Sequence, residues 1–210
     1  MSKIVTYIPR IDRLGYFEEY FQPEDVCNSD RQEFAIDNSK PDQIQIANLI
    51  NELAASYGKR SDIRLFSIDL SKRNIINHGR EIEGQMANHD EKLHADSVFS
   101  LALRYIKFVR DPRGAEYVQS PYRMLRMFCQ TGEMYGDCDD HVLLVNSLLN
   151  SLGFKTKVVL VTVGEATEYN HVISKVFFST TNKWIYFDAC NKQNPFKSYD
   201  NVKHFETSTI

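Results

Sequence analysis

Three residue types that carry out nucleophilic catalysis occur in the order cysteine, histidine and aspartate within about fifty residues of this 210-residue chain. Cys138 lies in the run Gly-Asp-Cys-Asp-Asp-His (136–141), which we expect to begin a helix. Free main-chain N–H groups and the positive end of the helix dipole favour a thiolate there and are able to hold an oxyanion. The flanking carboxylates oppose the thiolate, so a nearby imidazolium is needed. Cys138 is therefore a candidate nucleophile, with a purely structural cysteine as the alternative.

The candidate base is His171, and the candidate orienting group is Asp188. His171 begins a predicted strand, Asp188 ends the next one, and residues 179–182 join them. A loop of two or four residues pairs positions whose numbers sum to about 361, which places His171 and Asp188 diagonally on one face, roughly 7–8 Å apart at Cα. A three-residue loop would separate them. If they meet, Asp188 fixes the tautomer of His171, and His171 activates Cys138.

The elements that must position these residues follow from the hydrophobic period and from turn residues. We expect helices, extended segments and one long polar connection in this order: a helix from Pro41 to Gly58, an extended segment 63–70, a connection 72–91, helices 93–109, 120–132 and 137–152, and strands 155–163, 171–178 and 183–189. Helices followed by strands indicate an α+β fold with an antiparallel sheet.

The first forty residues lack the clear hydrophobic periodicity of the rest of the chain. A β-like run at 4–8 ends at Pro9, and an aromatic and acidic stretch with poor periodicity follows. We weigh two interpretations, a strand and loops packed on the main domain, or an arm whose aromatic residues dock into a partner protein. The predicted organisation is an N-terminal extension at 1–90, with one helix and irregular segments, and a main domain at 91–210.

Composition excludes several classes of protein. Hydrophobic residues make up 42% and charged residues 25%, which is ordinary for a globular chain. A net charge of −3 without a basic stripe argues against nucleic acid as a partner. No long apolar run predicts a membrane span, and no secretory signal is visible. Four cysteines without a CxxC motif predict a reducing, cytoplasmic environment.

The ordered motifs resemble the transglutaminase-like superfamily. The resemblance covers roughly residues 93–192 and rests on the Gly-Asp-Cys-Asp-Asp-His run, the Leu-Gly-Phe at 152–154, the Asn-His-Val at 170–172 and the Phe-Asp at 187–188. The stretch 109–121 is similar to members encoded by tailed bacteriophages and prophages. The resemblance implies a papain-like fold, in which the cysteine helix packs on an antiparallel sheet that carries histidine and aspartate.

The resemblance also assigns roles. Cys138 matches the nucleophile, His171 the base and Asp188 the orienting carboxylate, while Tyr135 is the nearest candidate for the second oxyanion donor. The expected function is hydrolysis or transamidation of a peptide or amide in a protein or peptide substrate, without a cofactor. The alternative is a phage virion or assembly protein that keeps the fold with little or no catalysis and meets other phage structural proteins through residues 1–40. The expected location is the bacterial host cytoplasm or a virion.

Simpler roles are open to the residues around Cys138. The aspartates at 137, 139 and 140, with His141, form a cluster able to bind a cation, but first-turn aspartates that stabilise a helix dipole are the better interpretation, and we predict no metal. Cys190 falls beside His171 in the expected register, where a disulfide with Cys138 is a minor alternative. Cys129 is expected to be a buried small hydrophobic residue.

Overall fold

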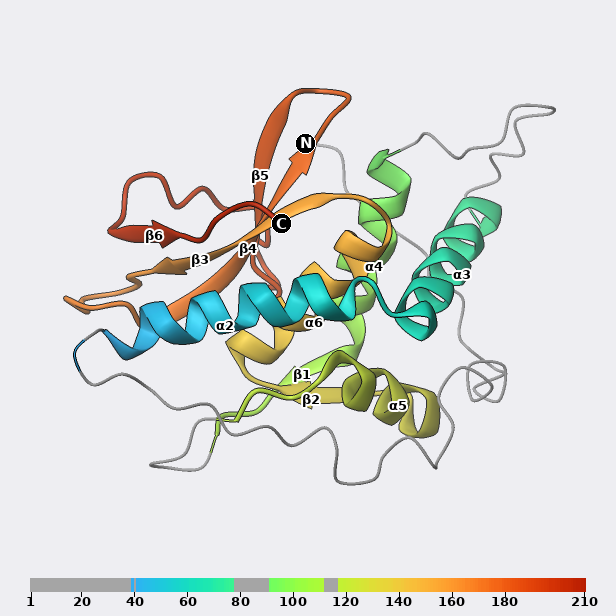
Figure 1. Cartoon of the computed structure of the whole chain (residues 1–210), viewed down its shortest axis with the longest axis horizontal. Helices are drawn as coiled ribbons and strands as arrows, with labels where there is room; N and C mark the ends of the chain where they lie inside the picture. Colours follow the sequence, from blue (N-terminus) through green and yellow to red (C-terminus); the bar gives the residue numbers. More distant parts are fainter. Residues whose placement is uncertain (1–38, 40, 78–90, 112–116) are drawn as a thin grey trace.

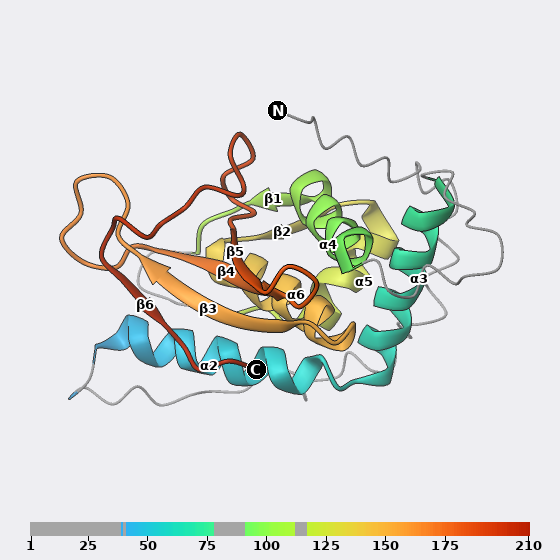
Figure 2. The same cartoon turned by 90° about the horizontal axis from the view of Figure 1, so that it is seen from above.

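The helix α6 (Cys138–Ser151) is the central element of the computed structural model, which describes residues 39, 41–77, 91–111 and 117–210. Helix α2 lies along one side of α6, and α4 and α5 lie on the other (Figures 1 and 2). Residues 141–149 of α6 are all buried, including Leu144, Leu148 and Leu149. A helix that is buried all round is expected when it is surrounded by other elements, so α6 forms the middle of the core.

The other elements surround α6. They are α2 (Asp42–Tyr57), α3 (Ser61–Asn77), α4 (Glu91–Tyr105), β1 (Ile106–Phe108), α5 (Pro121–Thr131), β2 (Met134–Gly136), β3 (Lys155–Val161), β4 (His171–Phe178), β5 (Lys183–Phe187) and β6 (His204–Glu206). The main sheet has the order β5-β4-β3-β6, and each of its pairs is antiparallel. The predicted α+β class, with the cysteine helix packed on an antiparallel sheet, is confirmed.

The register of the hairpin β4–β5 is the one that the sequence predicts. Ser174 pairs with Phe187 and Phe178 with Lys183, and each pair of numbers sums to 361. The connection is the four-residue loop 179–182, in which Asn182 has a positive φ of 52°. His171 and Asp188 therefore continue the same face of the sheet from neighbouring strands.

The extended segment predicted at 63–70 is wrong, because these residues belong to α3. Ile63, Phe66 and Leu70 are buried, whereas Leu65 is 51% exposed. Burial at i, i+3 and i+7 is the helical period, and the β-branched and aromatic residue types concealed it. The predicted connection also shrinks, since 72–77 continue α3, Glu91 begins α4, and 78–90 lie outside the described residues.

The helix predicted at 93–109 ends early, at Tyr105. Residues 106–108 instead form β1, which pairs in parallel with β2 over three residues. The amide of Val109 extends this pairing by donating to the carbonyl of Gly136 at 2.9 Å. A helix prediction based on the local hydrophobic period missed strand β1, because its partner β2 lies nearly thirty residues further along the chain. The pairing fixes the chain immediately before Cys138.

The predicted limits of α5 are confirmed. The Ser120 hydroxyl accepts a hydrogen bond from the Arg123 amide, Pro121 occupies the first helical position, and Gly132 ends the helix with a left-handed φ of 79°. Glycine adopts this backbone without the steric cost that a Cβ brings. The chain between Gly132 and Cys138 is consequently short and well anchored.

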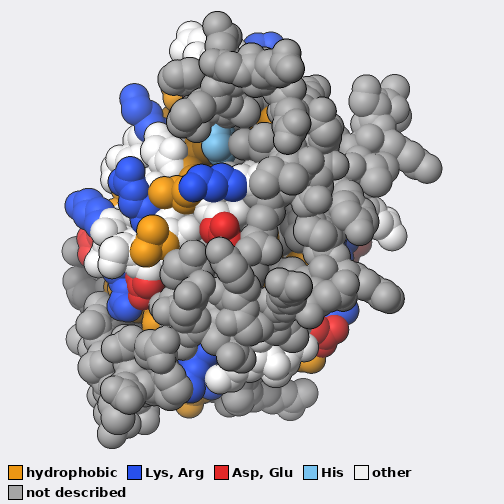
Figure 3. All heavy atoms as spheres, turned by 90° about the vertical axis from the view of Figure 1, so that its right-hand side faces the viewer, with side chains coloured by type: hydrophobic (Ala, Val, Ile, Leu, Met, Phe, Trp, Pro, Cys, Tyr) orange, Lys and Arg blue, Asp and Glu red, His pale blue; other side chains and the backbone are white. Residues whose placement is uncertain are grey.

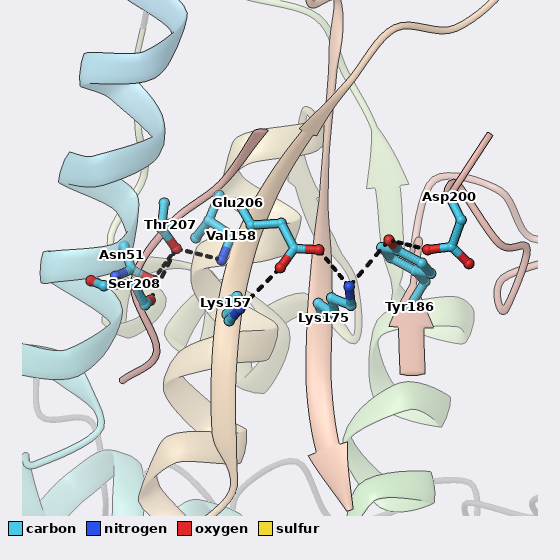
Figure 4. A network of polar contacts seen from close by, with 9 residues as sticks. All are labelled: Asn51, Lys157, Val158, Lys175, Tyr186, Asp200, Glu206, Thr207 and Ser208. Carbon is cyan, nitrogen blue, oxygen red and sulfur yellow. Dashed lines mark hydrogen bonds and ion pairs between the residues drawn. The ribbon is translucent and has the colours of Figure 1, made fainter. Parts of the chain in front are cut away.

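The C-terminal segment, which the sequence analysis did not assign, adds strand β6 to the edge of β3. Glu206 on β6 accepts from Lys157 at 2.9 Å and also binds Lys175, so it bridges β3 and β4 (Figure 4). Thr207 bonds to Asn51 of α2 at 2.9 Å. These contacts attach the last residues of the chain to both the sheet and α2.

Two predictions about the N-terminal part are not tested by the fold. The strand at 4–8 and the aromatic arm lie outside the described residues. Helices α2 and α3 pack against α6, with Ala47, Ile50 and Ala54 of α2 in one cluster with Val142 and Leu143 of α6. Among the described helices, none combines the length and the apolar character that a membrane span needs.

Candidate active site

Cys138 stands at the first position of α6, with Asp137 as the N-cap residue. Its side chain is partly buried, and the main-chain N–H of Val172, the residue after His171, lies at its sulfur. Burial, followed by the charges of Asp139 and Asp137, raises the pKa of the thiol to about 12. The thiol is thus the resting form unless a positive charge approaches it, as the sequence analysis expected.

Asp140 fixes the start of α6. Its carboxylate is 1% exposed and accepts hydrogen bonds from the Gln119 amide at 2.6 Å, the Gln119 side chain at 2.9 Å and the Asp137 amide at 3.2 Å. The last bond belongs to the capping box at the start of α6. A Cβ at Gly136 would lie 2.5 Å from the same carboxylate, so only glycine fits there. Burial, opposed by the bonds to Gln119, raises the pKa of Asp140 to about 6.

His171 and Asp188 meet, as the predicted register requires. Nε2 of His171 lies 2.9 Å from Oδ2 of Asp188, and the two side chains are 14% and 3% exposed. The same oxygen accepts from the Tyr199 hydroxyl at 2.7 Å, while the other accepts from the Cys190 amide at 3.0 Å. Burial acts to raise the pKa of Asp188, but the bonds from His171 and Tyr199 outweigh it and hold the pKa below its usual range.

The orientation of the imidazole follows from this contact. Because Nε2 faces Asp188, Nδ1 is the ring nitrogen left to exchange a proton with a reacting group. A carboxylate that holds one nitrogen of a histidine stabilises the imidazolium that forms at the other. The arrangement is therefore suited to general acid and base chemistry beside the N-terminus of α6.

Tyr135, the candidate oxyanion donor, lies on β2 three residues before Cys138. Its side chain is 40% exposed, and its hydroxyl donates to Glu133 at 2.6 Å. Its carbonyl accepts from the side chain of Gln119 at 3.0 Å. The hydroxyl is therefore engaged with Glu133 in this conformation, and a role for Tyr135 at the oxyanion stays a prediction.

Cys190 and His141 form a contact that the sequence analysis did not predict. The Cys190 sulfur lies 3.3 Å from Nδ1 of His141, which is 1% exposed. The expected position of Cys190 beside His171 is confirmed, since ligand atoms of His171, Asp188 and Cys190 lie within 4.8 Å of one another. Among the described residues, Cys129, Cys138 and Cys190 are thiols outside any disulfide, and Cys129 is buried as predicted.

Gln119 and Tyr199 are two further residues that sequence reasoning missed. Gln119 lies 21 residues from Asp140, to which it bonds, and Tyr199 lies 11 residues beyond Asp188. No local pattern signals such pairs. The helix predicted at 120–132 places Gln119 immediately before α5, but nothing in the sequence directs its side chain toward α6.

Two groups of side chains have donor atoms close enough for a metal ion within the part of the chain that the structure describes. The first is His171, Asp188 and Cys190, and the second comprises the aspartates at 137, 139 and 140. In the second group Asp140 already receives three hydrogen bonds, and its neighbour Asp139 accepts from the Asp140 amide at 2.8 Å. These bonds agree with a role in capping α6.

A pocket of about 830 Å³ lies at the opposite end of α6. It is lined by the C-terminal residues 150–153, by cations of α3 and the turn before it, and by Glu91. Figure 3 views the molecule from the side of α3, where Lys and Arg side chains lie beside Asp and Glu. Because a 14-residue helix is about 21 Å long, this pocket is remote from Cys138.

The family is decided by a comparison with protein-family models. Residues 83–189, just over half of the chain, match the model described as the transglutaminase-like superfamily. The chain belongs to the transglutaminase-like superfamily. The resemblance seen in the sequence is thereby confirmed at the level of the superfamily, and with it the papain-like α+β fold.

Comparisons with individual proteins give more distant likenesses. No curated protein sequence matches the chain. Calcium-bound LapG of Legionella pneumophila shares 16% identity, with a TM-score of 0.43, and 77% of this chain and 83% of LapG are covered.

Two structures of Rad4 share less sequence. The Rad4–Rad23 complex bound to a 6-4 photoproduct UV lesion has 9% identity, a TM-score of 0.40 and 78% and 45% coverage. A structure of the Rad4/XPC nucleotide excision repair complex, concerned with β-hairpin motifs in DNA duplex opening, has 10% identity, a TM-score of 0.40 and 78% and 40% coverage.

Proposed function

We propose that this transglutaminase-like protein is a cysteine acyl-transfer enzyme in which Cys138 is the nucleophile, His171 the base and Asp188 the group that orients His171. The observation that carries the proposal is the 2.9 Å contact between His171 and Asp188 at the end of β4 that meets the start of α6. The amide next to His171 lies at the Cys138 sulfur, which supports proximity of the base to the nucleophile.

The chemistry follows in two steps. His171 takes the thiol proton through Nδ1 as the sulfur of Cys138 attacks an amide carbonyl, and Asp188 stabilises the imidazolium. The C–N bond breaks, the imidazolium gives its proton to the leaving amine, and a thioester remains on Cys138. Water then releases a carboxylic acid, or a second amine releases a new amide. Water is always present, so we propose hydrolysis of a peptide or protein amide as the default reaction.

The negative charge that develops on the carbonyl oxygen of the substrate needs hydrogen-bond donors to stabilise it. Main-chain N–H groups of the first turn of α6 point at the position of Cys138, and the helix dipole adds to their effect. Tyr135 belongs to the proposal as the second donor, and its hydroxyl would have to leave Glu133 when substrate binds.

The proposal also includes a bacteriophage origin and a location in the host cytoplasm or a virion, on the basis of the stretch 109–121.

The test is the rate at which iodoacetamide labels Cys138, measured against pH by mass spectrometry. In the wild type, we expect labelling to persist below about pH 7, because a thiolate–imidazolium pair supplies the reactive form. In His171→Ala no imidazolium can offset the burial and the neighbouring aspartates, both of which raise the pKa of the thiol. Labelling of this variant at pH 7 should therefore fall well below that of an ordinary free thiol.

The controls separate reactivity from folding. His204→Ala removes an exposed histidine of β6 and should leave the profile unchanged, and Cys190→Ser confirms that the labelled sulfur belongs to Cys138. Equal profiles for the wild type and His171→Ala would contradict the proposal. That result would favour the alternative, a structural or assembly protein of a phage particle that keeps the fold without catalysis.

A further inference from the structure

Cys190 is a thiol next to the proposed triad that the reaction does not use. It follows Asp188 by two residues, and its amide donates to the Asp188 carboxylate at 3.0 Å. Its sulfur lies 3.3 Å from Nδ1 of His141, in the first turn of α6. A histidine and a cysteine thus face each other on one side of Asp188, with no part in the acyl-transfer steps.

The same sulfur lies close to the triad. Donor atoms of His171, Asp188 and Cys190 all fall within 4.8 Å of one another, and His171 and Asp188 are in contact at 2.9 Å. A tetrahedral ion bound at about 2.0–2.3 Å from nitrogen, oxygen and sulfur separates its ligand atoms by about 3.3–3.8 Å. Within the group His171, Asp188 and Cys190, the separations run from 2.9 Å to at most 4.8 Å and so bracket this range. Nδ1 of His141 lies 3.3 Å from the Cys190 sulfur but outside that group, so His141 would have to approach His171 and Asp188 to act as the fourth ligand.

The donor types select the metal. Calcium and magnesium prefer oxygen ligands, whereas a thiolate with imidazole nitrogens and one carboxylate suits zinc. We propose that Cys190, His141, His171 and Asp188 form a Zn²⁺-binding site beside the nucleophile. Binding exchanges the thiol proton of Cys190 for a sulfur–zinc bond and releases that proton to solvent.

Zinc at this site would regulate the enzyme. A metal ion on the ring of His171 prevents the imidazole from accepting the Cys138 proton, so the labelling of Cys138 and any turnover should stop. This inhibitory consequence rests on the proposed function, whereas the binding of the ion does not.

The experiment measures Zn²⁺ binding by competition with a chromogenic chelator, and Co²⁺ binding by its absorption spectrum. We expect one ion per chain and a sulfur-to-cobalt charge-transfer band, which reports a thiolate ligand. Cys190→Ser should abolish the band and weaken Zn²⁺ binding at least tenfold. Cys129→Ser is the matched control, because Cys129 is a buried thiol of α5, and it should leave both signals intact.

A second pair of variants locates the ion. Cys138→Ala removes the proposed nucleophile and should retain the band and the affinity, while His141→Phe should lose affinity as Cys190→Ser does. Loss of the band in Cys138→Ala with its retention in Cys190→Ser would overturn the site, as would the absence of binding at micromolar Zn²⁺. Because Cys138→Ala has no acyl-transfer chemistry, zinc binding in this variant stands even if the labelling test contradicts the proposed function.

Discussion

At the scale of the residue, Asp140 is the side chain that most directly determines where Cys138 sits. Its buried carboxylate receives three hydrogen bonds, two from Gln119 and one from Asp137. Cys138 and Asp139 lie between Asp137 and Asp140, so the bond from the Asp137 amide to the Asp140 carboxylate closes the first turn of α6 around the proposed nucleophile. The site thus depends on a group that has no part in the chemistry itself.

We predict that Asp140→Ala lowers the free energy of unfolding by about 2–4 kcal/mol, because it leaves the Gln119 and Asp137 donors without their buried partner. Urea denaturation measures this loss, with Glu165→Ala in an exposed loop as the control that should change stability by less than about 0.5 kcal/mol. Gly136→Ala displaces the same carboxylate and should also slow the labelling of Cys138. Wild-type stability in Asp140→Ala would show that these bonds do not hold the turn.

At the scale of the element, the hairpin that carries His171 and Asp188 is fastened at its far end by α4. Glu91 accepts from the amides of Ser179 at 3.0 Å and Thr180 at 2.8 Å, and it also binds both hydroxyls. Burial acts to raise the pKa of Glu91, but the bonds to Ser179 and Thr180 prevail and lower the pKa from 4.5 to about 2. The loop that sets the register is therefore fixed by a carboxylate from a distant helix.

We predict that Glu91→Gln lowers the free energy of unfolding by about 1 kcal/mol at pH 7, a value reduced by solvent screening of a largely accessible group. The folded pKa is depressed, so the stabilisation is complete above the unfolded value of 4.5 and is lost as pH falls from there toward 2. Urea denaturation of the wild type and of Glu91→Gln between pH 7 and pH 2 measures the difference in their free energies of unfolding. The difference should stay constant down to about pH 5 and then shrink; a difference that grows at low pH would contradict the assignment.

At the scale of the whole molecule, the C-terminal segment connects the outer face of the sheet to α2. Glu206 binds Lys157 and Lys175, and Lys175 reaches the hydroxyl of Tyr186 at 3.2 Å (Figure 4). Thr207 then bonds Asn51 at 2.9 Å. Strands β3, β4 and β5 are in this way tied to a helix that the sequence analysis placed in the N-terminal extension.

We predict that Glu206→Gln lowers the free energy of unfolding by about 1–2 kcal/mol, because two lysines lose a partly buried anionic partner. The loss should decrease when the salt concentration is raised, since salt weakens the ion pairs in the wild type. Urea denaturation at low and high salt measures it, with Glu168→Gln in an exposed loop as the matched control. Hydrogen exchange of residues 204–210 should quicken in the variant; unchanged exchange there would argue against the attachment.

Features that depend on neighbours in the chain were predictable from the sequence. The start of α6 at Cys138, the limits of α5 and the pairing of His171 with Asp188 each follow from capping residues or from the length of one loop. In these cases a few consecutive residues set the backbone conformation, and the alternation of side chains along a strand decides which of them share a face of the sheet. The predicted triad order and its family resemblance came from the same local patterns.

Only the tertiary structure decided the features that join distant segments. The parallel pair of β1 and β2, the Gln119 contact with Asp140, the Cys190 contact with His141 and the attachment of β6 each link residues from 21 to more than 40 positions apart. Helix α3 is a related case, because its apolar residues show their helical face only when α4 and α6 bury it. Local sequence sets which conformations a segment favours, whereas packing against partners far along the chain selects one of them and brings the second thiol to the site.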